Sequence, residues 1–173
     1  ICYSDNSSIH SIYFGGGTPS LLSVGNFSAI LDTIRSSFVV DDKAEVTLEA
    51  NPGTVDASYL TAIRKLGINR LSLGIQSLHD AELTMLGRIH TVTEARDAVR
   101  LARDAGFENL NLDLIYGLPG QSLLDWQYTL REAVAIEAEH LSLYCLSMES
   151  GTPLWQANKE KRIPAKVYAT LLF

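Results

Sequence analysis

Five segments of the chain alternate apolar and polar residues, as half-buried strands do, and segments with helical spacing lie between them. Between residues 110 and 114, for example, three leucines alternate with Asn111 and Asp113. Because successive side chains of a strand point to opposite faces, each predicted strand has one apolar and one polar face. The repeated strand and helix order predicts an α/β fold. We place the strands at Ile9–Phe14, Glu45–Glu49, Arg70–Ile75, Leu110–Leu114 and His140–Leu146.

The polar face of these strands distinguishes two parallel architectures. A doubly wound sheet is covered by helices on both faces, so its strands are almost continuously apolar. Polar groups buried there without partners would each cost several kcal/mol. A barrel instead places such groups in its interior, where they face a bound polar ligand. We therefore predict an open, partial (β/α) barrel with about five strand–helix units rather than a Rossmann-like sheet.

Three of the intervening segments carry helix start signals followed by apolar stripes. Glycine ends the first two of these helices, and we expect all three stripes to pack in the core. After the fifth strand, Glu149–Pro164 predicts a loop and a short helix. The start signals are Asp56, Thr91 with Glu94, and Ser122 with Asp125; the stripes are Leu60–Leu66, Ala95–Ala102 and Trp126–Val134.

Composition argues against several classes of protein. With 173 residues, 46% hydrophobic and 20% charged, the chain has the balance of one soluble domain with a sizeable core. The net charge of −6 argues against nucleic-acid binding, and no apolar run is long enough for a transmembrane segment. With no signal-like N-terminus, we expect a cytoplasmic protein. Cys2 and Cys145 are too few for a disulfide scaffold, which favours a reducing compartment.

The histidines and cysteines predict no metal site within this chain. The histidines lack the paired spacing of metal ligands, so satisfied or solvent-facing side chains are expected. Cys145 shares the apolar face of the fifth strand, and we expect it to be a small core residue. The four histidines are His10, His79, His90 and His140.

The first strand ends in a glycine-rich turn. Within Ile9–Pro19, the alternating run breaks into Gly15, Gly16, Gly17 and Thr18. Without a Cβ, these glycines let the backbone turn sharply and let its N–H and C=O groups contact a ligand directly. A tight turn without a ligand has the same composition, so the glycines alone leave both interpretations open. The residues at the ends of the later strands favour a ligand-binding turn.

Polar residues stand at the carboxyl ends of the predicted strands. These ends meet at one mouth of a (β/α) barrel, where ligand-binding residues gather. Arg88, after the third strand, adds a cation suited to a bidentate pair with a carboxylate. Each residue alone has a structural explanation, but together they suit a small, zwitterionic and hydroxylated ligand. The predicted site comprises Gly16, Gly17, Thr18, Glu49, Gln76, Arg88 and Asp113, and no residue is identified as catalytic.

Five motifs follow one another along the chain. They are Tyr13-Phe-Gly-Gly-Gly-Thr-Pro-Ser-Leu-Leu22, Leu48-Glu-Ala-Asn-Pro-Gly-Thr54, Arg70-Leu-Ser-Leu-Gly-Ile-Gln-Ser77, Leu86-Gly-Arg-Ile-His90 and Asn111-Leu-Asp-Leu-Ile-Tyr-Gly-Leu-Pro-Gly120. In this order and spacing they resemble radical S-adenosylmethionine (radical SAM) proteins of the oxygen-independent coproporphyrinogen III oxidase family. The resemblance covers nearly the whole chain. The second and fourth motifs resemble the family's heme chaperone branch, HemW, whereas oxidases usually have an Asp-Pro-Arg type sequence after the glutamate.

This resemblance implies a TIM-like partial barrel of the radical SAM type, which binds S-adenosylmethionine near a [4Fe–4S] cluster. In the family, the cluster reduces the sulfonium and releases a deoxyadenosyl radical. The resemblance further implies that the glycine turn contacts the methionine moiety and that Arg88 binds its carboxylate. The remaining polar site residues, Glu49, Gln76 and Asp113, would contact the amino group or the ribose hydroxyls.

The resemblance leaves two functions open. A heme chaperone binds heme as cargo and delivers it to an acceptor protein, whereas the oxidase decarboxylates coproporphyrinogen III to protoporphyrinogen IX. A third interpretation is a (β/α) fragment without intact activity. In the family, a Cys-x-x-x-Cys-x-x-Cys loop upstream of the glycine turn holds the cluster, and these residues lack it. The chaperone branch also has a downstream His-Asn-x-x-Tyr-Trp segment associated with heme. Since the chain starts at Ile1 without methionine and stops at Phe173, we expect residues 1–173 to be a central fragment of the core.

Overall fold

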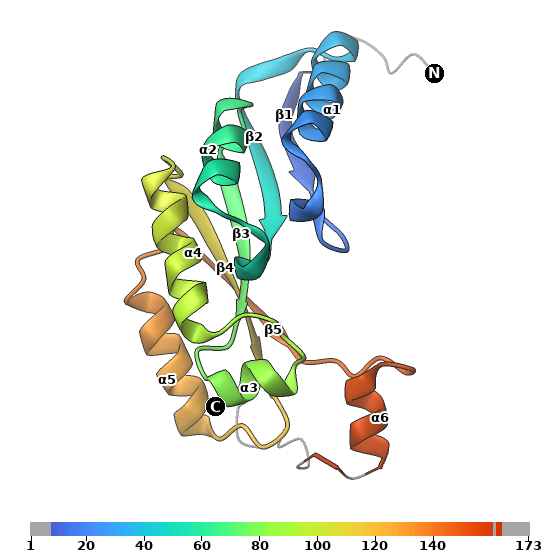
Figure 1. Ribbon diagram of the computed structural model, residues 1–173, viewed down its shortest axis with the longest axis vertical. Coiled ribbons are helices and arrows are strands. Elements are labelled where there is room, and N and C mark those ends of the chain that lie inside the picture. Colours follow the sequence, from blue (N-terminus) through green and yellow to red (C-terminus); the bar gives the residue numbers. More distant parts are fainter. Residues whose placement is uncertain (1–7, 161, 164–173) are drawn as a thin grey trace.

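The computed structural model describes residues 8–160, 162 and 163. Its five strands form one parallel sheet in chain order, β1-β2-β3-β4-β5, and Figure 1 shows this sheet curling along its length. The predicted partial (β/α) barrel is confirmed, and so is the position of every strand, although β2 begins five residues before the predicted Glu45. The strands are β1 (Ile9–Phe14), β2 (Val40–Ala50), β3 (Arg70–Gln76), β4 (Asn109–Tyr116) and β5 (His140–Cys145).

Helices connect the successive strands, and Figure 1 shows α2, α4 and α5 side by side along the sheet. None of the helices in the described residues is long and apolar enough to cross a membrane. The α-helices are α1 (Val24–Ser37), α2 (Ala57–Lys65), α3 (Asp80–Met85), α4 (Val92–Asp104), α5 (Leu123–Val134) and α6 (Pro153–Lys159), and the short 3₁₀ helices are η1 (Pro19–Leu21) and η2 (Pro52–Thr54).

The predicted helix signals act as capping interactions. At the start of α2, the backbone N–H of Tyr59 donates to Asp56 Oδ1 at 2.8 Å. The predicted residue pairs at the starts of α4 and α5 both form complete capping boxes. Gly67 and Gly106, which follow α2 and α4, have φ angles of +101° and +87°. Glycine adopts this left-handed conformation without a steric penalty, so each one ends its helix cleanly.

The apolar core lies between the helices and one face of the sheet. Alternate residues of β2, β3 and β4 are buried there against side chains of α1, α2, α4 and α5. Burying one such leucine or isoleucine stabilises the fold by about 1.5–3 kcal/mol. Fully buried members include Phe27, Leu31, Leu48, Leu60, Ile63, Leu71, Leu73, Leu110 and Leu112.

The opposite face of the central strands carries a polar network. Ser72 Oγ donates to Asp113 Oδ2 at 2.9 Å, and Ser142 Oγ donates to Asn111 Oδ1 at 3.0 Å. Asn111 Nδ2 donates to both Ser72 Oγ, at 2.7 Å, and Asp113 Oδ1, at 2.8 Å. These side chains come from β3, β4 and β5 and form hydrogen bonds with one another. They form the polar interior that the alternating pattern predicts.

Two packing predictions near β5 are wrong. Cys145, expected in the core, is exposed, and Val134 at the end of the third predicted stripe is 64% exposed. Among the described strands, β5 pairs only with β4, so its outer part lacks the neighbours that cover the central strands. Leu143 of β5 is 47% exposed for the same reason. The short helix predicted in Glu149–Pro164 is α6, whereas Pro164, Cys2 and the chain end at Phe173 lie outside the described residues.

Candidate functional site

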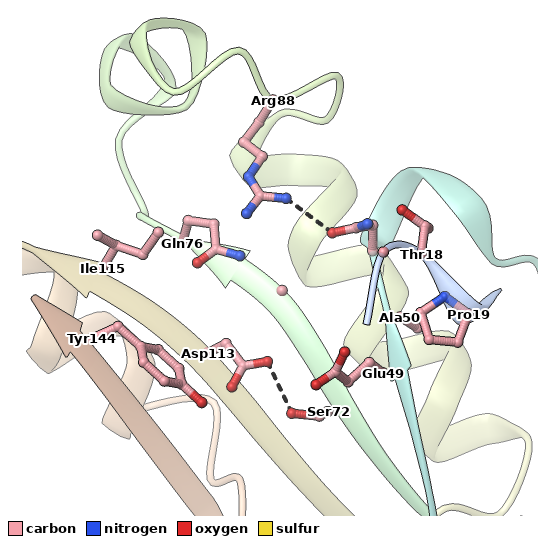
Figure 2. A pocket seen from close by; sticks show the side chains of 13 residues that line it. Thr18, Pro19, Glu49, Ala50, Ser72, Gln76, Arg88, Asp113, Ile115 and Tyr144 are labelled. Atoms are coloured by element: carbon pink, nitrogen blue, oxygen red, sulfur yellow. Dashed lines mark hydrogen bonds between the residues drawn. The ribbon is translucent and has the colours of Figure 1, made fainter. Parts of the chain in front are cut away.

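A cavity of about 360 Å³ lies at the carboxyl ends of the strands, on the polar face of the sheet. Figure 2 shows Arg88 pointing into it from one side while Glu49 and Asp113 point into it from the strands. Gly16 is outside the lining, but its N–H donates to Glu49 Oε2 at 3.0 Å. The structure thus brings the whole predicted set together, and its ligand-binding role stays a prediction. The predicted residues that line the cavity are Gly17, Thr18, Glu49, Gln76, Arg88 and Asp113.

Each glycine of the turn after β1 occupies a position that disfavours a side chain. A Cβ at Gly15 would lie 2.6 Å from Cε1 of Tyr13, so a side chain there would displace the tyrosine ring. Gly16 and Gly17 have φ angles of +89° and +61°, in the left-handed region that other residues rarely adopt. Thr18 then leads into η1. The turn therefore brings the backbone of Gly17 and Thr18 to the cavity wall, while the N–H of Gly16 donates to Glu49.

Arg88 enters the cavity from the segment between α3 and α4. Its Nη1 donates to Asn51 Oδ1 at 3.1 Å. Burial lowers the pKa of the guanidinium, and the charge of Asp113 partly offsets this shift. Within the described part of the chain, Arg88 forms no ion pair. A half-buried cation whose guanidinium donates to a neutral amide is suited to an anionic ligand group.

Asp113, within β4, supplies the opposite charge. Burial raises the pKa of its carboxyl group, and the nearby charge of Glu49 adds to this effect. The hydrogen bonds from Ser72 and Asn111 oppose it, because they stabilise the ionised form. Neither Asp113 nor Glu49 forms an ion pair among the described residues. The two carboxylates are therefore available to a cationic or hydroxylated group, opposite the cation of Arg88.

Gln76 occupies a strained backbone position at the end of β3. Its φ angle is +68°, which costs a non-glycine residue roughly 1–2 kcal/mol. Two residues earlier in the strand, a Cβ at Gly74 would lie 2.9 Å from both Asn51 Oδ1 and Gln76 Nε2, so a side chain there would displace these two amides. Backbone strain of this kind concentrates at functional sites. The absence of a side chain at Gly74 therefore leaves room for both amides in the cavity wall.

Sequence reasoning missed several residues of the site. Ser72 and Tyr144 line the cavity from the polar faces of β3 and β5, so the alternating pattern already contained their signal. Asn51 follows directly on the Glu49 segment, but no local signal indicates that it contacts Arg88. Tyr13, outside the cavity lining, donates its hydroxyl to Glu49 Oε1 at 2.8 Å.

The histidines lie apart from this cavity. His90 is buried and its Nε2 lies 3.0 Å from the carbonyl oxygen of Ile75. His79 packs its ring against Tyr128, and its Nε2 lies 3.2 Å from the carbonyl oxygen of Asp125. In residues 8–160, 162 and 163, no group of three or more histidine, cysteine, aspartate and glutamate side chains is arranged to hold a metal ion.

Comparison with known proteins links this geometry to one superfamily. Residues 3–133 match the model of the Radical SAM superfamily. The chain is 45% identical over 144 residues to the heme chaperone HemW of Haemophilus influenzae, an alignment that covers 83% of this chain and 38% of the relative. It is 42% identical over 152 residues to the heme chaperone HemW of Escherichia coli, with 88% and 40% covered. The chain thus spans 38–40% of the length of these curated relatives.

A solved structure has the same arrangement of elements. Coproporphyrinogen III oxidase (HemN) from Escherichia coli, described as a radical SAM enzyme, superimposes with a TM-score of 0.78. The superposition covers 91% of this chain and 37% of that chain, with 26% sequence identity. The half-barrel is therefore shared with a protein of known structure.

Proposed function

Because the chain belongs to the radical SAM superfamily, we propose that its cavity binds S-adenosylmethionine and that the intact protein is a HemW-like heme chaperone. One observation carries the ligand assignment. The cavity combines a half-buried cation, Arg88, with two carboxylates, Glu49 and Asp113, and none of them has an ion pair in the described residues. This charge pattern complements the zwitterionic amino acid end of S-adenosylmethionine.

The residues fit this ligand group by group. The guanidinium of Arg88 has the fork of donors that binds a carboxylate in a bidentate manner. Glu49, Gln76 and Asp113 would bind the ammonium group or the ribose hydroxyls, and the backbone of Gly16–Thr18 would contact the methionine moiety. When bound, S-adenosylmethionine supplies the sulfonium centre for the radical chemistry after which the superfamily is named.

A [4Fe–4S] cluster does not fit the described residues. Such clusters are held by several cysteine thiolates, and the sequence contains only two cysteines. Cys145 is exposed on β5, and Cys2 lies outside the described residues. We infer that the cluster of the intact protein is held by residues beyond these 173, and that this chain is the central part of the radical SAM core.

The relatives favour a chaperone over an oxidase. Identity is 45% and 42% to the two HemW proteins but 26% to HemN. The proposal therefore includes heme as cargo, a heme-acceptor protein as partner, and the cytoplasm as compartment. The alternative is an oxygen-independent coproporphyrinogen III oxidase that decarboxylates coproporphyrinogen III to protoporphyrinogen IX. Because both functions use S-adenosylmethionine, loss of its site does not separate them, and only the second substrate does.

An anaerobic assay with both second substrates tests this assignment. The full-length protein is incubated with reductant, S-adenosylmethionine and coproporphyrinogen III, and porphyrins are separated by chromatography. A parallel titration follows heme binding by its absorbance, and HemN of Escherichia coli serves as the positive control for decarboxylation. We expect heme binding without decarboxylation. Repeated turnover to protoporphyrinogen IX without tight heme binding would establish the oxidase instead.

A further inference from the structure

The Glu49 carboxylate is held from two directions by residues outside the cavity lining. Tyr13 donates its hydroxyl to Oε1 at 2.8 Å, and Gly16 donates its backbone N–H to Oε2 at 3.0 Å. The three residues belong to β1, the glycine turn and β2, so one carboxylate joins three segments. Each carboxylate oxygen has a second lone pair, which leaves it able to accept a further hydrogen bond.

The strand register and one glycine make this contact possible. Tyr13 pairs with Thr47 in the parallel register of β1 and β2, which places it beside the strand that carries Glu49. Thr47 and Glu49 share a strand face, since successive side chains alternate. A Cβ at Gly15 would lie 2.6 Å from Cε1 of Tyr13 and 3.1 Å from Glu49 Oε1. The missing side chain at Gly15 therefore leaves room for the ring and the carboxylate to meet.

The chemistry of the donor matters as much as its position. Tyr13 is 57% exposed, and partial burial of its hydroxyl raises its pKa to about 12; the hydrogen bond to Glu49, the charges of Glu49 and Asp113, and nearby Tyr144 add to this shift. Tyrosine is protonated at neutral pH even at its ordinary pKa of 10.0, so the phenol is a donor to Glu49 there. A neutral donor orients the carboxylate without cancelling its negative charge, whereas lysine or arginine at this position would form an ion pair with it.

We propose that Tyr13 is a positioning residue of the ligand site, which together with the Gly16 N–H fixes the Glu49 carboxylate for a cationic or hydroxylated ligand group. The ligand part of this inference rests on the proposed binding of S-adenosylmethionine. A carboxylate that is already oriented loses less conformational freedom when the ligand binds, so binding is tighter. The hydroxyl of Tyr13 acts through Glu49 and touches no ligand itself.

A tyrosine titration tests the hydrogen bond from Tyr13 to Glu49, here called the clamp, without any ligand. In the full-length protein, the ultraviolet difference between the unaltered protein and Tyr13→Phe isolates the ionisation of Tyr13. We expect Tyr13 to ionise above its ordinary pKa of 10.0 in the unaltered protein and at a lower pH in Glu49→Gln, because the carboxylate no longer stabilises the protonated phenol. Circular dichroism at the same pH checks that the protein stays folded. Ionisation of Tyr13 near its ordinary pKa of 10.0 in the unaltered protein would overturn the clamp.

Calorimetric titration with S-adenosylmethionine tests the ligand role. We expect Tyr13→Phe to weaken binding about three- to tenfold, the effect of one hydrogen bond, while the control Tyr128→Phe on α5 binds like the unaltered protein. Glu49→Gln should weaken binding further, and adding Tyr13→Phe to it should have no additional effect. A purely structural role for Tyr13 would instead give additive losses and would overturn the inference, as would unchanged affinity in Tyr13→Phe.

The two measurements separate this inference from the proposed function. Absence of S-adenosylmethionine binding by the unaltered protein would overturn the proposed function and, with it, the ligand role of Tyr13. The titration would still decide whether Tyr13 holds Glu49, because it needs no ligand. A raised Tyr13 pKa together with the non-additive binding losses supports the inference in full.

Discussion

Several residues of the cavity are held in states that are unfavourable without a ligand. Burial raises the pKa of Asp113 and lowers the pKa of Arg88, so both charges are disfavoured where they stand. Gln76 adds a strained backbone angle of +68°. Ionisable groups perturbed in this way, and strained residues, concentrate at functional sites. A zwitterionic ligand would offset both charges at once.

Replacing Arg88 tests the cation directly. In the full-length protein, Arg88→Ala is expected to weaken S-adenosylmethionine binding by about 1.5–3 kcal/mol, the scale of a charge-assisted hydrogen bond. Arg88→Lys keeps the charge but loses the planar fork of donors, so its affinity should lie between those of the unaltered protein and the alanine variant. Calorimetric titration measures both. Equal affinity in all three proteins would make Arg88 a structural residue only.

The raised pKa of Asp113 predicts how its contribution to stability depends on pH. Below its ordinary pKa of 3.8 the carboxyl group is protonated in both the folded and the unfolded protein. As the pH rises above 3.8, the unfolded state loses this proton first, so the contribution of Asp113 to the free energy of unfolding falls until the folded-state pKa is passed. The melting temperature of the unaltered protein should therefore decline relative to Asp113→Asn across this window.

A second carboxyl group gives a control of opposite sign. The backbone hydrogen bond from Tyr59 lowers the pKa of Asp56, the residue that caps α2. Its contribution is present above 3.8 and is lost as the pH falls through the lowered value, so the unaltered protein should gain stability relative to Asp56→Asn as the pH rises. If the stability of the unaltered protein rose with pH relative to both Asp113→Asn and Asp56→Asn, the raised pKa of Asp113 would be contradicted.

At the scale of helices and strands, the sequence predicted the features that depend on residues close together in the chain, namely the helix caps and the polar strand faces. A capping box joins residues three positions apart, so Thr91 with Glu94 could be identified from the chain alone. The polar strand face could be predicted as well, because alternation with a period of two needs no knowledge of the neighbours. These faces carry the network of Ser72, Asn111 and Asp113.

Contacts between distant segments could not be predicted in this way. Whether Cys145 is buried depends on which elements cover β5, not on the alternation along the strand. Tyr13 contacts Glu49 across 36 positions of sequence, and Arg88 contacts Asn51 across 37. Nothing local marks either pair, so the sequence predicted Glu49 and Arg88 as site residues but not the residues that orient them.

The arrangement of the whole molecule explains why scattered residues form one site. All five strands are parallel and follow chain order, so their carboxyl ends lie along one edge of the curled sheet. Residues from Gly17 to Tyr144 therefore line one cavity although they come from all parts of the described chain. The topology brings together donors and charges for a small ligand, but it places no group of metal-ligating side chains in the described residues.

The contrast between a formed ligand cavity and the small number of cysteines leads to a prediction for the chain as a whole. The 173 residues alone are expected not to assemble a stoichiometric [4Fe–4S] cluster, because the sequence has two cysteines where a cluster needs several thiolates. Cys145 is exposed on β5, 143 positions after Cys2, and no other cysteine accompanies it. Anaerobic reconstitution with iron and sulfide, followed by desalting and assays of both elements, measures the yield. The full-length protein under the same conditions is the control and should retain a cluster. One cluster per 173-residue chain would show instead that side chains other than cysteine complete the ligand set.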